Sequence, residues 1–409
     1  MIMNNKKILI VSLTFPPMGD ATANIIGKLI NKFKAHGCEV SGLALKTTDS
    51  DKTEYNGINV YHINHKQYSI LSKSRKIGDR IKCLMMRINS KLPNWWKKGS
   101  YHEYEARAIY KAMKKFYLSS YDAVLCVCAY YSAIEGVLRY KKASKSNFKV
   151  LLLQVDPLTD NLSYPQRQYE KRKAYEKKLY ENCDYVFTTP IIYDNIEKNG
   201  FRKDNVSVVE FPLVEKPCYS EDIKIQDKKE NEIRCVFAGY LYPNIRDAKY
   251  TLELFSKFKN ENIKLYILGT GQEELLKSYE NGSLKGRLIR LGSLSSNVCN
   301  AWLKDADVLV NIGNSVLNQV PSKIFDYVSR GKCILNICKS EKCPTLRYLN
   351  KYPLAINIIE GKDLNKEDFN RIEQLIINIQ WKIIDYNKVE EIFYDCTPQY
   401  VAETILEKV

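Results

Sequence analysis

One stretch, residues 311–335, constrains the fold more than any other part of the chain. It reads NIGNSVLNQVPSKIFDYVSRGKCIL. The residues from Asp307 to Ile312 predict a buried strand, a polar loop follows, Pro321 opens a helix, and Gly331 ends that helix. Strand, loop and helix in this order are typical of a βαβ unit, in which the loop lies at the carboxyl end of the strand and binds ligands.

The start of this predicted helix has the residues of an anion site. Pro321 in the first turn removes an N–H group that would lack a partner, and the remaining free N–H groups together with the helix dipole favour an anion. Lys323 adds a full positive charge. Asp326, three residues later on the same face, can accept hydrogen bonds from a pair of ribose hydroxyls. The stretch therefore predicts a site for a phosphate joined to a sugar.

The same residues carry a resemblance to a known family. Residues 321–326 (PSKIFD) and 327–334 (YVSRGKCI) are similar to the P-S-K-x-x-E and Y-x-x-x-G-K-P-I segments of retaining glycosyltransferases with the GT-B fold. Two positions depart from that pattern, because Asn318 and Asp326 stand where the family usually carries two Glu. Asp326 keeps a carboxylate on a shorter arm, whereas Asn318 lacks the charge.

The resemblance implies a fold and an activity. The fold is α/β with GT-B architecture: two facing Rossmann-like domains with parallel sheets and a cleft between them. The activity is transfer of a sugar from a nucleoside-diphosphate-sugar donor to a lipid-linked or glycan acceptor in surface polysaccharide synthesis, with retained configuration and neither a metal nor another cofactor. The catalytic residues are then Arg246 and Lys323, whose charges replace Mg²⁺ in neutralising the departing diphosphate.

The predicted donor site draws on several loops of the second half of the chain. In the family, a glycine-led loop after the first C-terminal strand delivers a cation to the diphosphate, and Arg246 fits this role because a guanidinium grips phosphate through two donors. Two more predicted strands end in glycines, which let backbone N–H groups approach a base or phosphate. The residues expected to bind the donor are Gly239, Arg246, Gly269, Gly271, Asn318, Ser322, Lys323 and Asp326.

The first half supplies the predicted acceptor side. The apolar run from Lys6 to Thr14 predicts a strand buried on both faces of a parallel sheet, and a loop with Gly19 and Asp20 joins it to a helix. The resemblance places the acceptor against this loop. The loop lacks GxGxxG, however, and an ordinary turn between strand and helix explains it equally well. Asp156 follows a later strand and either orients an acceptor hydroxyl or caps the next turn.

Strands separated by helical patterns continue along the chain, which favours βαβ repeats, and 409 residues suffice for two domains. We expect an N-terminal acceptor-side domain over residues 1–215, a polar linker over 216–232 and a nucleotide-sugar-binding domain over 233–390. The resemblance suggests that a final helical segment, 391–409, returns to the first domain.

Charge is distributed unequally along the chain. Residues 1–215 hold 35 Lys and Arg against 21 Asp and Glu, whereas residues 216–409 hold 28 against 26. Within the first half, residues 65–98 contain ten basic residues and one acid, with apolar residues at helical spacing and the pair Trp95-Trp96 after them. This pattern is typical of a helix at an anionic membrane surface. The alternative is a helix that packs on its own domain with solvated lysines. No nucleic-acid-binding motif accompanies the charge.

Other features narrow the compartment and the chemistry. The twelve cysteines form no CxxC pair, and no His follows residue 102, which excludes a His-based metal site in the second half. No run of about 18 apolar residues is present, and the N-terminus lacks the cleavage region of a signal peptide. We therefore expect a cytoplasmic protein, peripheral on the inner face of the membrane.

The absence of a His at the predicted strand end 129–131 favours a front-face mechanism in which the leaving phosphate helps to deprotonate the acceptor. Two alternatives stay open. One is a nucleotide-sugar epimerase of the same fold, which needs carboxylate acid and base groups. The other is a non-catalytic nucleotide-sugar binding protein.

Overall fold

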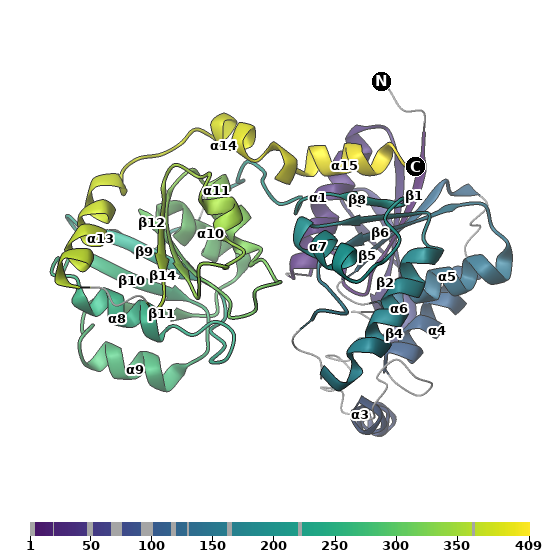
Figure 1. The fold of residues 1–409 in the computed structure, drawn as a ribbon, viewed down its shortest axis with the longest axis horizontal. Coiled ribbons are helices and arrows are strands. Elements are labelled where there is room, and N and C mark those ends of the chain that lie inside the picture. The colour runs from purple at the N-terminus through teal and green to yellow at the C-terminus, as the bar shows by residue number, and fades with distance from the viewer. Residues whose placement is uncertain are drawn as a thin grey trace. The chain divides into compact units, whose positions relative to one another are not determined.

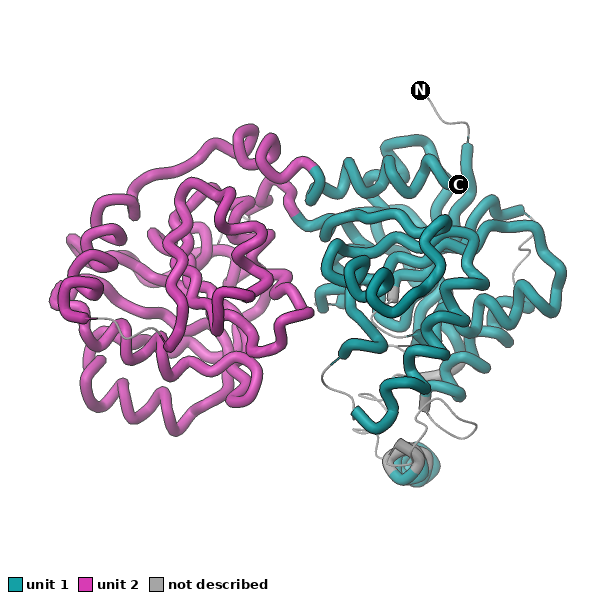
Figure 2. Tube along the Cα trace, viewed as in Figure 1, with its two compact units in different colours: residues 1–213, 395–409 teal, residues 214–394 magenta. Residues whose placement is uncertain are grey.

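The computed structural model describes most of the chain: residues 5–18, 20–46, 52–66, 76–90, 101–115, 120–128, 131–161, 166–219, 223–361 and 365–409. The chain divides into two compact units, coloured separately in Figure 2. Unit 1 comprises residues 1–213 and 395–409, and unit 2 comprises residues 214–394. The polar stretch 216–232 therefore belongs to unit 2.

Within the described residues, unit 1 contains one eight-stranded sheet with the order β3-β4-β2-β1-β5-β6-β7-β8. Neighbouring strands of this sheet are parallel, apart from the antiparallel pair β3 and β4. The chain starts with β1 in the middle, and the strand order reverses between β1 and β5. The strands are β1 (Lys7–Val11), β2 (Glu39–Lys46), β3 (Lys52–Tyr55), β4 (Ile58–Lys66), β5 (Ala123–Cys128), β6 (Lys149–Gln154), β7 (Tyr185–Thr188) and β8 (Val206–Val208).

Five helices of unit 1 pack against one another as Figure 1 shows: α4, α5 and α6 lie together, and α1 lies against α15. His36, which follows α1, has its Nε2 atom 2.9 Å from Gln399 Nε2 and 3.6 Å from Glu403 Oε1 of α15. Residues 395–409 thus pack on unit 1. The helices are α1 (Ala21–Ala35), α3 (Ile77–Ser90), α4 (Tyr101–Met113), α5 (Ser132–Ser144), α6 (Tyr169–Asn182), α7 (Pro190–Lys198) and α15 (Pro398–Leu406).

The strand predicted from the first apolar run is β1, and residues 8–11 within it are fully buried. Strand β3 was not predicted, because its sequence KTEY is short and has no apolar run. A signal for it exists in the next two residues. Asn56 and Gly57 have φ angles of 49° and 72°, and an Asn-Gly pair with positive φ at both residues is typical of a two-residue hairpin turn.

The described part of unit 2 contains a six-stranded, fully parallel sheet with the order β11-β10-β9-β12-β13-β14. This is the doubly wound order of a Rossmann fold, which reverses between β9 and β12. The strands are β9 (Ile233–Ala238), β10 (Ile263–Leu268), β11 (Leu288–Gly292), β12 (Val308–Ile312), β13 (Cys333–Cys338) and β14 (Ala355–Ile359). The helices are α8 (Lys249–Lys257), α9 (Glu273–Asn281), α10 (Ser296–Asp305), α11 (Lys323–Ser329), α12 (Leu346–Leu349), α13 (Lys366–Ile379) and α14 (Tyr386–Ile392).

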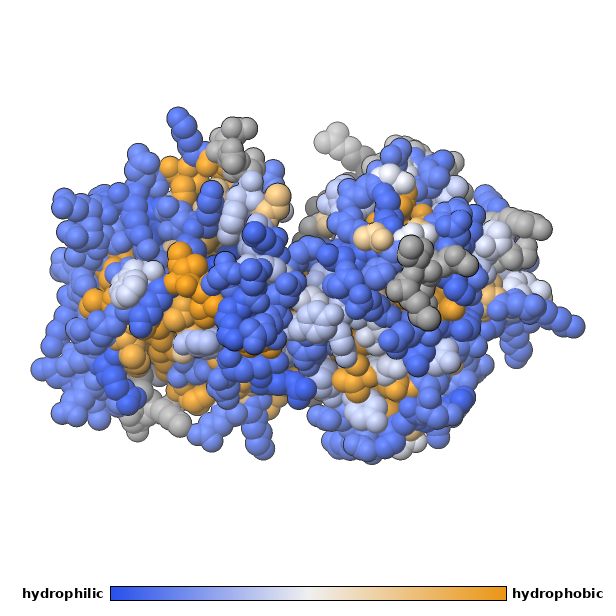
Figure 3. Space-filling model, turned by 90° about the horizontal axis from the view of Figure 1, so that it is seen from above, coloured by the Kyte–Doolittle hydropathy of each residue, from blue (hydrophilic) through white to orange (hydrophobic). Residues whose placement is uncertain are grey.

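The surface drawn in Figure 3 is mainly hydrophilic on both units, with apolar patches among the charged side chains. Helix α3 of unit 1 carries a row of large apolar side chains that face solvent instead of the core. Among the described residues, no helix is both long enough and apolar enough to cross a bilayer. The exposed residues of the α3 row are Ile77, Ile81, Leu84, Met85 and Ile88, each more than half exposed.

Candidate functional site

Two loops of unit 2 meet where the strand order reverses. One follows β9 and the other follows β12, at the carboxyl ends of both strands, which is where doubly wound sheets bind ligands. Ser315 of the second loop donates from its N–H to Ile245 O at 2.7 Å and from its hydroxyl to Asn244 O at 2.8 Å. Arg246 Nε donates to Asn314 Oδ1 at 3.1 Å. These hydrogen bonds fix the two loops against each other.

Arg246 is a half-buried cation that forms no ion pair within the described residues. Its guanidinium lies over the backbone of Gly239, since a Cβ atom built on that glycine would be 3.2 Å from Arg246 Nη1. Burial lowers the pKa of Arg246, while the nearby Tyr327 and Tyr242 hydroxyls act in the opposite direction. A desolvated guanidinium without a carboxylate is well suited to an anionic ligand.

The glycines after β10 have a packing role that the sequence did not predict. We expected Gly269 and Gly271 to admit a ligand close to the backbone, and that role stays a prediction. A Cβ atom on Gly269 would lie 1.8 Å from Gly239 O, and one on Gly271 would lie 2.1 Å from Leu241 O. The N–H of Gly271 donates to Glu273 Oε1 at 3.2 Å. Both glycines therefore allow the loop after β10 to pack on the loop that carries Arg246.

The helix after the second loop begins later than predicted. We placed Pro321 in its first turn, but α11 starts at Lys323 and has seven residues. Ser322 precedes the helix, and its side chain caps no backbone N–H. A helix this short contributes little dipole, so the charge of Lys323, whose side chain is 45% exposed, is the stronger attraction for an anion. Asn318 lies half-buried in the loop before it.

Asp326 lies one turn into α11 with a side chain that is 36% exposed. Its Oδ2 is 4.0 Å from Lys323 Nζ, and its Oδ1 accepts a hydrogen bond of 2.9 Å from Arg330 Nη2. Arg330 was not predicted as a site residue from the sequence. The i,i+4 spacing of an acid and a base on one helix would have indicated the pair.

Tyr327 connects these charges. Its hydroxyl accepts a hydrogen bond of 3.0 Å from the N–H of Ala238, which ties α11 to the end of β9. Burial raises the pKa of Tyr327; the charge of Asp326 raises it further and that of Arg246 lowers it. Arg246 covers Gly239, the residue after Ala238, and Tyr327 follows Asp326 in α11, so the hydrogen bond from Ala238 to Tyr327 brings the Arg246 loop and the start of α11 to the same end of β9.

On the predicted acceptor side, Asp20 caps a helix. Its Oδ1 accepts from the N–H of Ala23 at 2.8 Å and from the hydroxyl of Thr14 at 3.2 Å. This contact is the one expected of an ordinary turn between β1 and α1. Gly19 lies outside the described residues.

Asp156 does not cap a turn, so that interpretation of it was wrong. Within the described residues its carboxyl group takes part in no hydrogen bond or ion pair, and burial raises its pKa. Its backbone oxygen instead accepts from the hydroxyl of Tyr131 at 3.0 Å and from Gln154 Nε2 at 3.1 Å. Asp156 thus stands just beyond the carboxyl end of β6 with a carboxyl group available to a ligand.

A buried glutamate that was not predicted from the sequence holds this loop in place. Glu176 of α6 is 4% exposed. Its oxygens accept hydrogen bonds from Gln154 Nε2 (2.8 Å), the Thr159 N–H (3.0 Å), the Tyr131 hydroxyl (3.1 Å) and the Leu158 N–H (3.2 Å). No sequence signal marks Glu176, because these partners lie 17 to 45 positions away in the sequence.

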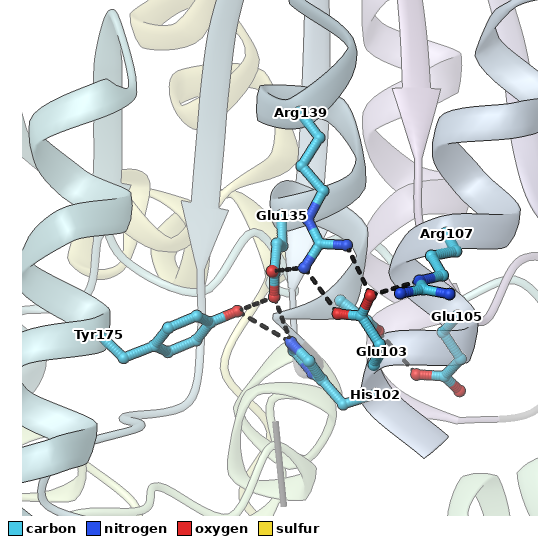
Figure 4. Close-up of polar contacts among 8 residues, drawn as sticks. His102, Glu103, Glu105, Arg107, Glu135, Arg139 and Tyr175 are labelled. Atoms are coloured by element: carbon cyan, nitrogen blue, oxygen red, sulfur yellow. Dashed lines mark hydrogen bonds and ion pairs between the residues drawn. The ribbon is translucent and has the colours of Figure 1, made fainter. Parts of the chain in front are cut away.

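A second polar network joins α4, α5 and α6 (Figure 4). Tyr175 and His102 both point at Glu135, with His102 Nε2 lying 2.6 Å from Glu135 Oε2 and 2.8 Å from the Tyr175 hydroxyl. Arg139 lies between Glu135 and Glu103 and donates to Glu103 Oε2 at 2.7 Å. Burial raises the pKa of Glu135, but the hydrogen bonds from His102 and Tyr175 and the charge of Arg139 outweigh it and lower this pKa to about 2. The network is explained by packing of the three helices.

Comparison with known proteins gives the fold. No protein-family model matches the sequence, and no curated protein matches it. Solved structures match almost the whole chain. The lipopolysaccharide outer core galactosyltransferase WaaB in its apo form is 14% identical, with 98% of each chain covered and a TM-score of 0.60. A trehalose-6-phosphate synthase studied for glycosyl transfer with retention is 10% identical, with the same coverage and a TM-score of 0.61.

A third similar structure is the UDP-GlcNAc 2-epimerase from Neisseria meningitidis bound to UDP-GlcNAc. It is 12% identical, covers 98% of this chain and 99% of its own, and has a TM-score of 0.55. These likenesses, with the two mostly parallel sheets, show that the chain has the GT-B fold, and the predicted fold class is confirmed.

Proposed function

We propose that this protein is a glycosyltransferase that takes its sugar from a nucleoside-diphosphate donor and retains the anomeric configuration. The observation that carries the proposal is Arg246, a half-buried guanidinium without an ion-pair partner in the described residues, held by Asn314 at the point where the unit 2 sheet reverses. A fixed, desolvated cation stabilises the charge that grows on a departing diphosphate.

The other charged groups of unit 2 fit the same chemistry. Lys323 supplies a second cation, and Asp326 supplies acceptor oxygens for the ribose hydroxyls. In this mechanism the leaving phosphate itself receives the proton of the acceptor hydroxyl, and transfer proceeds without a metal because Arg246 and Lys323 carry out the neutralisation.

The acceptor is proposed to bind unit 1 at the carboxyl end of its sheet. Asp156 is the side chain best placed to orient an acceptor hydroxyl, because Glu176 fixes its loop and its own carboxyl group is not engaged in the described part of the chain. A lipid-linked or glycan acceptor of surface polysaccharide synthesis is the class we propose, as the galactosyltransferase similarity suggests.

The proposal also places unit 1 on an anionic membrane surface through α3. Five large apolar side chains of this helix face solvent, and the basic residues Lys76 and Arg80 are exposed beside them. Cys83, on another side of the helix, is 7% exposed. A row of apolar side chains flanked by cations suits an anionic membrane. The apolar side chains can enter the acyl-chain region, and the cations can interact with the negatively charged head groups.

The similarity to epimerases supports a second candidate function, that of a nucleotide-sugar epimerase. An epimerase of this fold needs free carboxylates as acid and base near the hexose. In unit 2, the carboxylates of Asp247 and Asp326 both have protein partners: Asp247 accepts from Gln272 Nε2 at 2.7 Å and from the N–H of Lys249, and Asp326 accepts from Arg330. Asp156 of unit 1 is a carboxyl group without such a partner in the described residues, but an epimerase needs two. Transfer therefore fits the described residues better.

The purified protein should first be incubated with a panel of nucleotide sugars to find the donor that it slowly hydrolyses. With that donor, glycan and polyprenyl-linked acceptors are then tested, and the anomeric configuration of the product is read by NMR, with and without EDTA. Transfer with retention that is insensitive to EDTA supports the proposal. An epimerised nucleotide sugar without hydrolysis or transfer would favour the second candidate, and binding without turnover would favour a non-catalytic protein.

A further inference from the structure

Arg330 lies at the carboxyl end of α11, one turn after Asp326, and its side chain is 2% exposed. Its Nη2 atom donates to Asp326 Oδ1 at 2.9 Å and to Asn300 Oδ1 of α10 at the same distance. The ring of Tyr219 lies 5.7 Å from the centre of the guanidinium. Arg330 thus joins α10, α11 and the polar stretch that opens unit 2.

A guanidinium this deeply buried needs a counter-charge, because an unpaired ion in the protein interior is strongly disfavoured. In the described part of the chain, Asp326 is the carboxylate that pairs with it. The Nε and Nη1 atoms of Arg330 are buried and meet no acceptor there. The contact through Nη2 is therefore the one that holds the charge pair together.

The pairing determines how Asp326 presents its oxygens. Arg330 is rigidly enclosed whereas Asp326 is 36% exposed, so the arginine fixes one carboxylate oxygen, Oδ1, from the inner side. The other oxygen, Oδ2, stays on the open side, 4.0 Å from Lys323 Nζ. A carboxylate has about four lone-pair positions, and Arg330 uses one of them. The short side chain of Asp326 is thus held in a single orientation with acceptor positions left for a ligand.

We propose that Arg330 is a positioning residue that orients Asp326 toward the ribose of the nucleotide donor. Because Arg330 orients Asp326 in this way, the site distinguishes ribose from 2′-deoxyribose. The inference rests on the proposed function, because it needs a nucleoside diphosphate at this site. It assigns Arg330 no contact with the donor.

The test uses the full-length protein, the charge-conserving variant Arg330→Lys and the milder variant Asn300→Ala. Lysine keeps the charge but has a shorter side chain without the guanidinium, whose Nη2 atom donates to both Asp326 and Asn300. Asn300→Ala removes one of those acceptors and leaves the pair intact. A matched control is Arg290→Lys, since Arg290 also bonds two side chains of unit 2, those of Glu273 and Glu280.

Calorimetry compares UDP with dUDP, GDP with dGDP, ADP with dADP and CDP with dCDP. We expect the wild-type protein to bind one ribonucleotide roughly tenfold more tightly than its 2′-deoxy form, as the loss of a hydrogen bond to a charged group implies. This ratio should fall toward one in Arg330→Lys, fall less in Asn300→Ala and stay unchanged in Arg290→Lys. The value of kcat at saturating donor should change little in the three variants, whereas KM should rise in Arg330→Lys.

A merely structural role for Arg330 would lower the thermal midpoint and leave the ribose ratio as it is in the wild type. That result in a folded Arg330→Lys variant overturns the inference, and so does a wild-type ratio near one. In both cases the proposed function stands, because the nucleotide still binds. Failure of the wild-type protein to bind any of the eight nucleotides contradicts the proposed function itself and the inference with it. If Arg330→Lys does not fold, the ratio in Asn300→Ala decides.

Discussion

Arg246 Nε and Asn314 Oδ1 lie 3.1 Å apart, and this contact joins the loops that follow two adjacent strands, β9 and β12. The arginine is thereby oriented before any ligand binds. Because desolvation by burial already disfavours its charge, an anion that approaches Arg246 gains more than it would from a solvated arginine.

The first prediction concerns the two cations. Arg246→Ala and Lys323→Ala should each lower kcat by roughly 10²-fold or more, because each removes a preorganised charge from the leaving diphosphate. The effect is measured as initial rates of transfer at saturating donor. Arg290→Ala serves as a control for the first variant and Lys277→Ala, an exposed lysine of α9, for the second. Near-normal turnover in either site variant would remove that residue from the catalytic machinery.

The second prediction concerns Asp326 and its buried partner. Asp326→Asn should weaken binding of the nucleoside diphosphate roughly tenfold. It should also destabilise unit 2 by about 2 kcal/mol, because Arg330 then keeps a buried charge without a counter-ion.

The double variant Asp326→Asn with Arg330→Met separates the two effects. It should regain most of the thermal midpoint, since removing both partners leaves no unpaired charge, yet it should bind nucleotide as weakly as the single variant. Thermal melts and calorimetry on the same samples provide the comparison. If the loss of stability in the double variant equals the sum of the losses caused by the two single substitutions, Asp326 and Arg330 are not energetically coupled.

The third prediction concerns the packing of the loops. Gly271→Ala should destabilise unit 2 by at least about 2 kcal/mol more than Gly286→Ala. Both glycines have positive φ angles, 108° and 73°, but a Cβ on Gly271 meets Leu241 O at 2.1 Å whereas nothing lies within 4 Å of one on Gly286. The difference in denaturant midpoints therefore isolates the steric clash from the cost of the backbone conformation. Equal midpoints would mean that the two loops can separate freely.

The fourth prediction is a pH dependence of stability. The pKa of Glu135 falls from 4.5 to about 2 on folding, a change that corresponds to about 3 kcal/mol. A lowered folded-state pKa means that this stabilisation is fully present above pH 4.5 and is lost as the pH falls toward 2.

Glu135→Gln cannot ionise at this position, so the difference in unfolding free energy between it and the wild type should shrink steadily from pH 5 to pH 2. Urea melts across that range measure the difference. Glu391→Gln, at an exposed position where the side chain is 68% accessible, should follow the wild type at every pH. A constant difference between Glu135→Gln and the wild type would show that the ionisation of Glu135 is not linked to folding.

The elements that the sequence predicted well are those with a local pattern. The buried strand before residue 313, the polar loop and the helix with Lys323 and Asp326 are all present, because apolar runs and helical spacing are properties of neighbouring residues. The boundaries of the helices were predicted less accurately. Helix α11 begins two residues after Pro321, because a tight turn precedes the regular helix. In this turn the N–H of Ile324 donates to Pro321 O at 3.2 Å.

Features that depend on distant partners could not be predicted in this way. Glu176 binds groups from β6, the loop after it and the start of α5, and no local spacing connects these segments. The glycines after β10 show a related limit. The sequence indicates that the backbone of Gly269 comes close to another group, but it does not identify Gly239 O, 30 positions earlier, as a group that packs against this glycine.

The last prediction concerns the exposed apolar row of α3. If this helix docks on a membrane, its basic flank should direct unit 1 to anionic lipid, with each cation near the surface contributing on the order of 1 kcal/mol within a Debye length of about 8 Å. The apolar row should add a contribution to the binding free energy that salt does not screen. Sedimentation with vesicles should therefore require anionic lipid, weaken as salt rises and leave a salt-resistant remainder. Lys76→Gln with Arg80→Gln should reduce the salt-sensitive part.

The salt-resistant remainder should disappear when Ile81, Leu84 and Met85 are all changed to Ser, because these side chains are more than half exposed and available to a membrane. Trp381→Ser with Ile383→Ser is the matched control, since both side chains are 70% exposed but lie on unit 2. Trp95 and Trp96, at the far end of the basic segment, lie outside the described residues and are left unchanged. The membrane interpretation is contradicted if the protein binds neutral and anionic vesicles equally, or if the triple variant binds like the wild type. In either case α3 is a solvated helix, and a soluble glycan is the better candidate for the acceptor.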